Sequence, residues 1–284
     1  MNEKELFERD FSDDENYSEE DTDSDDEGSV EKYSVVFDTL IKIMNDEEVN
    51  LDILGHLDHT AFIVGKNNED ILVLKISKNY WPDLHTIPRE IRILHQLSDC
   101  KSIVTMHDFY VYPTSGAYAV VLDKIDEEDM EEEDKMDFVV KMFQGLKEIH
   151  DHNIIHRDIS SGNVLWTKNK EVKFIDFNMS CFDDEDHEHY RSCGTGDFTA
   201  NEVYEKQGYG KKIDVYAAGL VALAVLEGDI DDMTKMKETF TRTRHTEMVA
   251  DFFYHVLHHN PDTRFSADEA LAHQFLSQEN KQIK

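Results

Sequence analysis

The sequence is poor in cysteine, proline and tryptophan, with 3, 4 and 2 residues respectively among 284. Cys100, Cys181 and Cys193 form neither an even-numbered disulfide framework nor a metal-ligand spacing, so we expect a reducing intracellular setting, cytoplasmic or nuclear. The longest strongly apolar run, residues 215–226, is too short to span a bilayer. The first ten residues lack the positive flank and apolar stretch of a secretory signal, which predicts no export.

Basic residues are also scarce: the sequence has 29 Lys and Arg but 62 Asp and Glu, which gives a net charge of -33. A field of this sign repels phosphate backbones and anionic lipid surfaces, so we expect no direct binding to nucleic acid or membrane. Basic protein partners are attracted instead. The length suits one large domain or two lobes that share a cleft.

Residues 1–30 carry repeated Asp and Glu with few apolar groups, a composition that predicts a disordered acidic tail. Ser12, Ser18 and Ser24 each have an acidic residue three places later, a context that acidophilic kinases prefer. Two interpretations stay open for the tail: a site of regulatory phosphorylation, or a solvated, repulsive arm.

The most informative stretch is His156-Arg-Asp158, with Asn163 five residues later, then an apolar strand pattern over residues 172–175 and Asp176-Phe-Asn178. Asp158 can take a proton from an attacking hydroxyl. Asn163 and Asp176 offer the oxygen ligands that Mg²⁺ prefers beside nucleotide phosphates. This order of groups, H-R-D-x-x-x-x-N and then D-F-x, resembles the catalytic loop and metal-binding motif of the eukaryotic protein kinase family.

The resemblance covers about residues 50–276 and implies a two-lobed α+β fold, a small antiparallel β lobe and a larger, mainly helical lobe. It implies ATP and Mg²⁺ as cofactors, Asp158 as catalytic base, and Asn163 and Asp176 as metal ligands. Ser160 stands where many serine/threonine kinases have a lysine. Asn178 replaces the usual glycine and, because Asn tolerates left-handed backbone, is expected to make the same turn.

Upstream, the family's Gly-rich phosphate lid is only partly matched. Gly55 fits its first glycine, whereas Leu57 and Thr60 stand near the second and third. Lys75 matches the strand lysine that pairs with the α- and β-phosphates. Glu90, on a predicted helix that begins near Pro88, is expected to form an ion pair with Lys75.

Residues 103–112 and 117–122 are predicted strands that lead into a hinge between the lobes. By the resemblance, Leu122 lines the back of an adenine pocket, and backbone groups from Asp123 to Ile125 read the adenine edge. Residues 126–134 form an acidic block. It either favours substrates with basic flanks or serves as the solvated start of the next helix.

Residues 193–202 resemble the end of a kinase activation segment, with Thr195 expected to hydrogen-bond near Asp158. Glu202 is expected to be buried against Arg264, since a buried charge needs a partner. Arg157 is expected to brace the segment. Candidate phosphorylation sites are Ser180, Tyr190 and Ser192. The acidic residues around His187 and His189 indicate a mobile loop rather than a metal site.

Residues 214–228 match the buried central helix of the large lobe, and residues 271–276 resemble its closing helix. The part of the large lobe between these two helices is short, which suits a divergent kinase, for example a viral one. The predicted domains are a tail at 1–30, a kinase domain at 31–278 with lobes at about 45–123 and 126–278, and a C-terminal tail at 279–284.

The sequence therefore predicts a serine/threonine protein kinase that transfers the γ-phosphoryl group of ATP to protein substrates. This depends on the folded chain bringing Lys75, Asp158, Asn163 and Asp176 together around a magnesium-loaded nucleotide. Two alternatives stay open. One is a pseudokinase that acts as a scaffold or allosteric partner with weak or no transfer, and the other is a small-molecule phosphotransferase.

Overall fold

The structure is a computed structural model that describes residues 51–57, 61–66, 70–77, 87–112, 117–183, 189–190, 192–227 and 247–279. The chain divides into two compact units, one of Met1–His95 with Thr105–Lys124 and the other of Gln96–Val104 with Ile125–Lys284. The predicted tail at 1–30 lies outside the described residues, as do Thr60, His187 and the predicted C-terminal tail at 279–284 except Glu279, which belongs to a helix. The predicted domain limits remain predictions.

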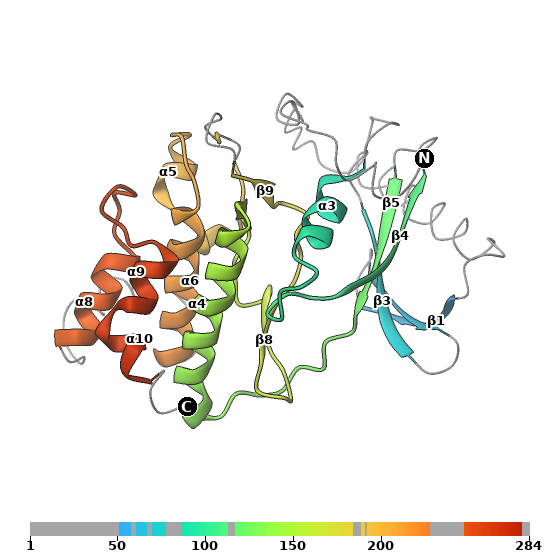
Figure 1. The fold of residues 1–284 in the computed structure, drawn as a ribbon, viewed down its shortest axis with the longest axis horizontal. Helices are drawn as coiled ribbons and strands as arrows, with labels where there is room; N and C mark the ends of the chain where they lie inside the picture. The colour runs from blue at the N-terminus through green and yellow to red at the C-terminus, as the bar shows by residue number, and fades with distance from the viewer. Residues whose placement is uncertain are drawn as a thin grey trace. The chain divides into compact units, whose positions relative to one another are not determined.

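The smaller unit contains a five-stranded antiparallel sheet with the strand order β1-β2-β3-β5-β4 (Figure 1). Its strands are β1 Leu51–His56, β2 Ala61–Lys66, β3 Asp70–Ile76, β4 Met106–Tyr112 and β5 Ala117–Asp123. Short connections join β1 to β2, β2 to β3 and β4 to β5, as expected for hairpins of alternating apolar residues. The predicted strand position of Lys75 is confirmed, since this residue lies in β3.

One face of this sheet is a hydrophobic core. Leu72, Leu74 and Ile76 of β3 are buried there with Val64 and Val121. Because side chains alternate across a strand, Lys75 belongs to the opposite face. The apolar alternation of β3 therefore decides which face of the sheet presents the lysine.

Helix α3, Arg89–Gln96, begins where Pro88 predicts. Ile91 and Leu94 are buried at helical spacing, as the sequence indicates. Glu90, in the first turn, is 4% exposed although it carries an ionisable side chain. The sequence periodicity alone does not reveal that burial.

The strand predicted from residue 103 begins only at Met106, so this boundary was wrong. Ile103 instead forms an isolated parallel bridge with Phe174 of β8, Val172–Phe174. The Val104 N–H donates to the Phe174 carbonyl at 3.0 Å, and the Phe174 N–H donates to the Ser102 carbonyl at 2.8 Å. These backbone groups therefore bond within the larger unit, to which Gln96–Val104 belongs.

The larger unit is mainly helical. Its helices are η1 Glu132–Asp134, α4 Lys135–Asp151, η2 Gly196–Phe198, α5 Asn201–Tyr204, α6 Lys212–Glu227, α8 Glu247–Val256, α9 Ala267–Ala272 and α10 Gln274–Glu279. Two small antiparallel pairs, β6 Ile154–Ile155 with β9 Cys181–Phe182 and β7 Val164–Trp166 with β8, lie between α4 and η2 in the sequence.

Helices α4 and α6 lie side by side, and α8, α9 and α10 pack around them (Figure 1). Eleven consecutive residues of α6, 213–223, are buried, which confirms the predicted central helix. An apolar surface on all sides of a helix requires neighbours on all sides. Among the described helices, none is long and apolar enough to cross a membrane.

The predicted closing helix is interrupted. α9 and α10 are separated by His273, whose backbone is extended (φ -62°, ψ 145°). The His273 ring packs against Phe252, and its Nε2 lies 3.1 Å from an Asp251 carboxylate oxygen. α9 begins with a capping box in which Ser266 and Glu269 satisfy each other's backbone N–H groups.

We predict that Gly145→Ala in α4 lowers the free energy of unfolding. A Cβ at position 145 would lie 2.7 Å from a Phe174 ring carbon and 2.7 Å from Ser102 Cβ. Overpacking of this kind costs about 1–3 kcal/mol, which exceeds the roughly 1 kcal/mol that alanine gains over glycine in a helix.

Urea denaturation measures this effect, with Gly162→Ala as the control because its Cβ would meet only Ser160 Oγ, at 3.9 Å. Equal unfolding free energies for the two variants would contradict the packing argument.

Candidate active site

The smaller unit holds a buried three-residue cluster around Glu90. Lys75 Nζ on β3 lies 2.9 Å from Glu90 Oε1, which confirms the predicted ion pair. The Tyr118 hydroxyl on β5 donates to the other carboxylate oxygen, Oε2, at 2.9 Å. Both oxygens of the buried carboxylate thus have a donor, and the position of Lys75 is fixed by the carboxylate it meets.

Tyr118 is a residue that sequence reasoning missed. Burial, and then the Glu90 charge, raises the pKa of the Tyr118 hydroxyl well above its usual range, so it stays a proton donor. The sequence offers one weak signal for it. A tyrosine in a wholly buried strand needs a partner for its hydroxyl.

The predicted hinge residues lie at the end of β5 and just after it. Leu122 is buried, at 7% exposure. The Asp123 N–H already donates to the Thr105 carbonyl at 2.9 Å, and its carboxylate lies 2.5 Å from His107 Nε2. The Asp123 N–H is therefore unavailable to a ligand. The role of the other backbone groups from Asp123 to Ile125 in reading adenine remains a prediction.

Gly55 lies in β1 beside an irregular register with β2. A Cβ there would meet only Ile63 Cδ1, at 3.8 Å, and its φ is not positive. Neither packing nor backbone conformation therefore requires a glycine at this position. Leu57, at the position of the family's second glycine, is 57% exposed.

Asp158, in the larger unit, has a donor on each carboxylate oxygen. Thr195 Oγ1 donates to Oδ1 at 2.6 Å, as predicted. Asn163 Nδ2 donates to Oδ2 at 2.9 Å and to the Asp158 carbonyl at 2.8 Å. The amide of Asn163 is thereby oriented with its nitrogen toward Asp158.

The loop that carries Asp158 is held by a buried carboxylate on α6. Asp214, 1% exposed, accepts the backbone N–H groups of His156 at 2.8 Å and Arg157 at 2.9 Å. His150 Nε2 of α4 lies 3.1 Å from the same carboxylate. Arg157 has φ +68°, a conformation that is uncommon for a long side chain and that the surroundings must maintain.

His156 is fully buried next to Phe177, with ring centroids 4.7 Å apart. Burial lowers the pKa of His156 despite nearby carboxylates, so its ring is held neutral. Its Nε2 lies 3.1 Å from the Ile175 carbonyl, and its Nδ1 accepts the Asp158 N–H at 3.3 Å. The neutral ring thus connects the two motifs.

Asn163 and Asp176 are brought near each other by the β7–β8 hairpin. The Ile175 N–H donates to the Asn163 carbonyl at 3.0 Å, next to Asp176. Asp176 has φ +61°, whereas Asn178 has no positive φ, so the expectation of a left-handed Asn178 was wrong. Asp, like Asn, tolerates the left-handed region, and the turn occurs two residues earlier.

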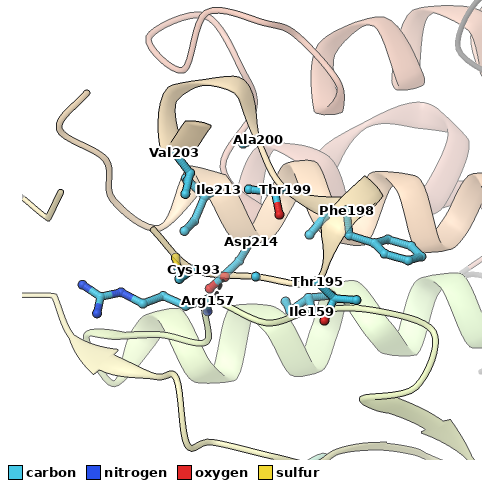
Figure 2. Close-up of a pocket in the computed structure, with 12 residues that line it drawn as sticks. Arg157, Ile159, Cys193, Thr195, Phe198, Thr199, Ala200, Val203, Ile213 and Asp214 are labelled. Carbon is cyan, nitrogen blue, oxygen red and sulfur yellow. Dashed lines mark hydrogen bonds between the residues drawn. The ribbon is translucent and has the colours of Figure 1, made fainter. Parts of the chain in front are cut away.

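The end of the activation segment packs closely on the catalytic loop. Gly194 has φ +96°, and a Cβ there would lie 2.9 Å from Thr199 Oγ1 and 3.2 Å from the Arg157 carbonyl. Figure 2 shows a small pocket beside it, with Thr195 and Ile159 at one end and Val203 at the other. The guanidinium group of Arg157 points away from this pocket.

Glu202 and Arg264 form the predicted buried pair. The Arg264 nitrogens lie 2.6 and 3.0 Å from the two Glu202 oxygens, and both residues are almost fully buried. Arg264 also donates to the carbonyls of His258 and Lys212 and lies over the Tyr216 ring. This pair attaches the end of the activation segment to the helical unit.

The structure contradicts two predictions about the activation segment. Ser180 is fully buried and donates to the His156 carbonyl at 3.0 Å, so it is not an accessible phosphorylation site. His189 is 1% exposed rather than part of a mobile loop. Tyr190 and Ser192 are exposed. The described residues contain no cluster of three metal-ligating side chains.

Comparison with known proteins assigns the sequence to one family. A family model for the protein kinase domain covers residues 60–276. The chain belongs to the protein kinase family. It therefore has the two-lobed α+β kinase fold, with an antiparallel sheet in one lobe and helices in the other.

Individual relatives are kinases of several kinds. The chain is 28% identical over 222 residues to calcium/calmodulin-dependent protein kinase cmkB of Emericella nidulans, covering 68% of the chain and 55% of the relative. It is 31% identical over 153 residues to calcium/calmodulin-dependent protein kinase type I of Schizosaccharomyces pombe, covering 47% of the chain and 45% of the relative. It is 29% identical over 150 residues to the serine/threonine-protein kinase polo of Drosophila melanogaster, covering 49% of the chain and 26% of the relative. The chain thus spans about half or less of these relatives.

The family implies ATP and a divalent metal, and the donor set of this chain fits Mg²⁺. Asn163 uses its amide nitrogen on Asp158, which leaves an amide oxygen for a cation, and Asp176 supplies a carboxylate. Mg²⁺ in such sites takes one or two protein carboxylates plus phosphates and water, so a site without three acidic ligands is compatible with it. The convergence of these residues with Lys75 remains a prediction.

We predict that Tyr118→Phe destabilises the kinase. The substitution keeps the ring and leaves Glu90 Oε2 buried without its hydroxyl donor, a loss of about 1–3 kcal/mol. The unfolding free energy from urea titration measures this loss. Tyr254→Phe is the matched control because Tyr254 is 63% exposed. An unchanged free energy for Tyr118→Phe would mean that its hydroxyl does not support Glu90.

Proposed function

We propose that this protein is a serine/threonine kinase that transfers the γ-phosphoryl group of ATP, with Mg²⁺, to hydroxyl groups of protein substrates. The observation that carries the proposal is the environment of Asp158. Its carboxylate is oriented by Asn163 on one side and accepts the Thr195 hydroxyl at 2.6 Å on the other. A carboxylate held in this way can accept the proton of an incoming hydroxyl.

The remaining roles follow from the positions of the other residues. Lys75, fixed by Glu90, would neutralise the α- and β-phosphates. Asn163 and Asp176 would hold Mg²⁺, which neutralises charge on the transferred group. Leu122, the Asp123 carbonyl and the Ile125 N–H would bind adenine. Gly55 would let the backbone approach the phosphates.

Serine and threonine are the proposed acceptors. The catalytic loop lacks the Ala and Arg combination usual in tyrosine kinases. The names of the relatives support the same specificity, including polo and the probable kinase of Encephalitozoon cuniculi, both named serine/threonine kinases. Phosphoamino-acid analysis of the product distinguishes the acceptors directly.

A pseudokinase scaffold is the second candidate, and the phosphate lid favours it. Leu57 stands where a glycine would allow close backbone approach, and Ser160 replaces a lysine that would meet the transferred phosphate. A pseudokinase of this kind would bind nucleotide poorly. A thermal shift of the full chain with Mg²⁺-ATP separates the candidates before any substrate is known.

We predict that Asp158→Asn abolishes transfer while the protein stays folded. The amide keeps the shape of the carboxylate but cannot accept a proton, so the rate should fall about a hundredfold or more. Radiolabelled ATP with a mixture of casein, histone and myelin basic protein measures the transfer. Asp262→Asn, an exposed aspartate, is the control and should keep the wild-type rate.

Asp176→Ala provides a second arm of this experiment. It should lose transfer and also the Mg²⁺-dependent part of the thermal shift, because it removes the proposed metal ligand. A nucleotide-induced shift with no transfer by the wild-type chain would favour the scaffold. Equal transfer by wild type and Asp158→Asn would exclude the proposed catalytic base.

The acidic block supports a preference for basic substrates. Asp134 is buried and pairs with Lys170 at 2.7 Å, which assigns it a structural role. Glu127, Glu128 and Asp129 are exposed before the helix begins. These exposed carboxylates would attract Lys or Arg near the phosphorylated residue.

We predict that, on an array of serine peptides, those with basic flanks are phosphorylated faster than neutral ones at low salt. The Glu127→Gln, Glu128→Gln double variant should reduce this preference, whereas Glu269→Gln in the α9 capping box should not. Equal rates across the array would assign the block to the start of the helix alone.

A further inference from the structure

His189 makes a buried contact with the catalytic loop that the proposed function does not use. Its Nδ1 lies 2.7 Å from Nη2 of Arg157, the residue before Asp158. Both side chains are buried, at 1% and 5% exposure. Because a guanidinium group can only donate, Nδ1 must accept, and His189 therefore presents the lone pair of a neutral ring.

Tyr209 completes the contact from a third segment. Its backbone N–H donates to the His189 carbonyl at 3.1 Å, and its ring stacks on the imidazole at an interplanar angle of 30° with centroids 5.8 Å apart. The Arg157 guanidinium lies over the same ring, 5.3 Å from its centroid. The guanidinium therefore has an aromatic face and a hydrogen-bond acceptor as neighbours.

This cluster fixes Arg157 at both ends. Asp214 accepts its backbone N–H, and His189 accepts its side chain. The backbone between them has φ +68°, which relaxes unless it is restrained. Asp158 is the next residue, so the direction of its carboxylate depends on this restrained peptide.

Many kinases order the activation segment by phosphorylation, because a phosphate added to the segment pairs with an arginine. Here a neutral imidazole from the segment meets the arginine of the catalytic loop. The exposed hydroxyls of Tyr190 and Ser192 lie close to His189 in sequence, but the described contact needs neither of them.

We infer that His189 is a positioning residue: it holds Arg157, and through it Asp158, so that the segment is ordered without a phosphate. The inference rests on the proposed function. The inference goes beyond the proposed function because it assigns the active arrangement of the activation segment to an imidazole–guanidinium contact in the unmodified chain.

The first test asks whether the unmodified chain is active. The full chain is treated with phosphatase, intact mass confirms that no phosphate remains, and initial rates of transfer from ATP are measured. The expected result is a rate within about twofold of the untreated protein. A loss of tenfold or more, the scale of one charge-assisted hydrogen bond, restored by rephosphorylation, would overturn the inference.

The second test compares substitutions that differ in acceptor capacity. His189→Ala removes the acceptor and should lower kcat by about tenfold or more, with little change in KM for ATP. His189→Asn keeps an acceptor atom, Oδ1, at the same number of bonds from the backbone, and should recover most of that loss. Failure of asparagine to recover more than alanine would assign His189 to packing alone and overturn the inference.

His259→Ala is the matched control, because His259 is exposed in the same unit. Hydrogen exchange gives a readout independent of activity. Amides of residues 193–199 and 205–210 should exchange faster in His189→Ala than in His189→Asn or the control. If the wild-type chain transfers no phosphate, the proposed function fails. Exchange then still decides whether His189 orders the segment, and equal exchange in all variants would overturn that part.

Discussion

One buried carboxylate sets the geometry of the catalytic loop. Asp214 is 1% exposed on a helix that is apolar on all sides, and it accepts two consecutive backbone N–H groups. An unpaired charge at that depth would be costly, so the loop must supply these donors. The chain therefore cannot bury α6 without also fixing the peptide units before Asp158, and the stability of the helical unit enforces the geometry of the loop.

The other buried charges follow the same rule. Glu90 has a donor on each oxygen from two different strands, and Glu202 has two nitrogens of a single arginine. Buried ion pairs add little net stability compared with apolar packing, but losing one partner costs several kcal/mol, about 3–5. Their value here is positional. Each pair holds a segment in place: the start of α3 beside Lys75 in one case, and the end of the activation segment in the other.

The spacing of the motifs predicted three contacts between charged or polar side chains. Lys75 with Glu90, Thr195 with Asp158, and Glu202 with Arg264 were all expected from the sequence and are present. The partners that were missed, Tyr118 and His189, have no fixed spacing to the groups they contact. Apolar periodicity indicates that such a residue is buried, but not which polar atom it meets.

Backbone conformation was predicted less well for a related reason. The turn after β8 was assigned to Asn178 because of side-chain preference, whereas Asp176 has the positive φ. Likewise, His273 interrupts the closing helix without a Gly or Pro to signal it. In both places tertiary contacts decide the conformation: Phe177 is buried against His156, and His273 packs on Phe252. Local propensity is a weak guide where a buried ring must reach a fixed position.

The two histidines of this region, in the catalytic loop and the activation segment, serve as neutral hydrogen-bonding groups. Burial outweighs the attraction of Asp214, Asp158 and Asp176 and lowers the pKa of His156, and an arginine donor requires a neutral His189. Neither ring therefore offsets the charge of Asp158 and Asp176. Imidazolium in their place would repel a cation, whereas neutral rings add no positive charge beside Asp158 and Asp176. Oxygen ligands without an imidazolium beside them suit a divalent metal, and this connects the burial of these side chains to the proposed chemistry.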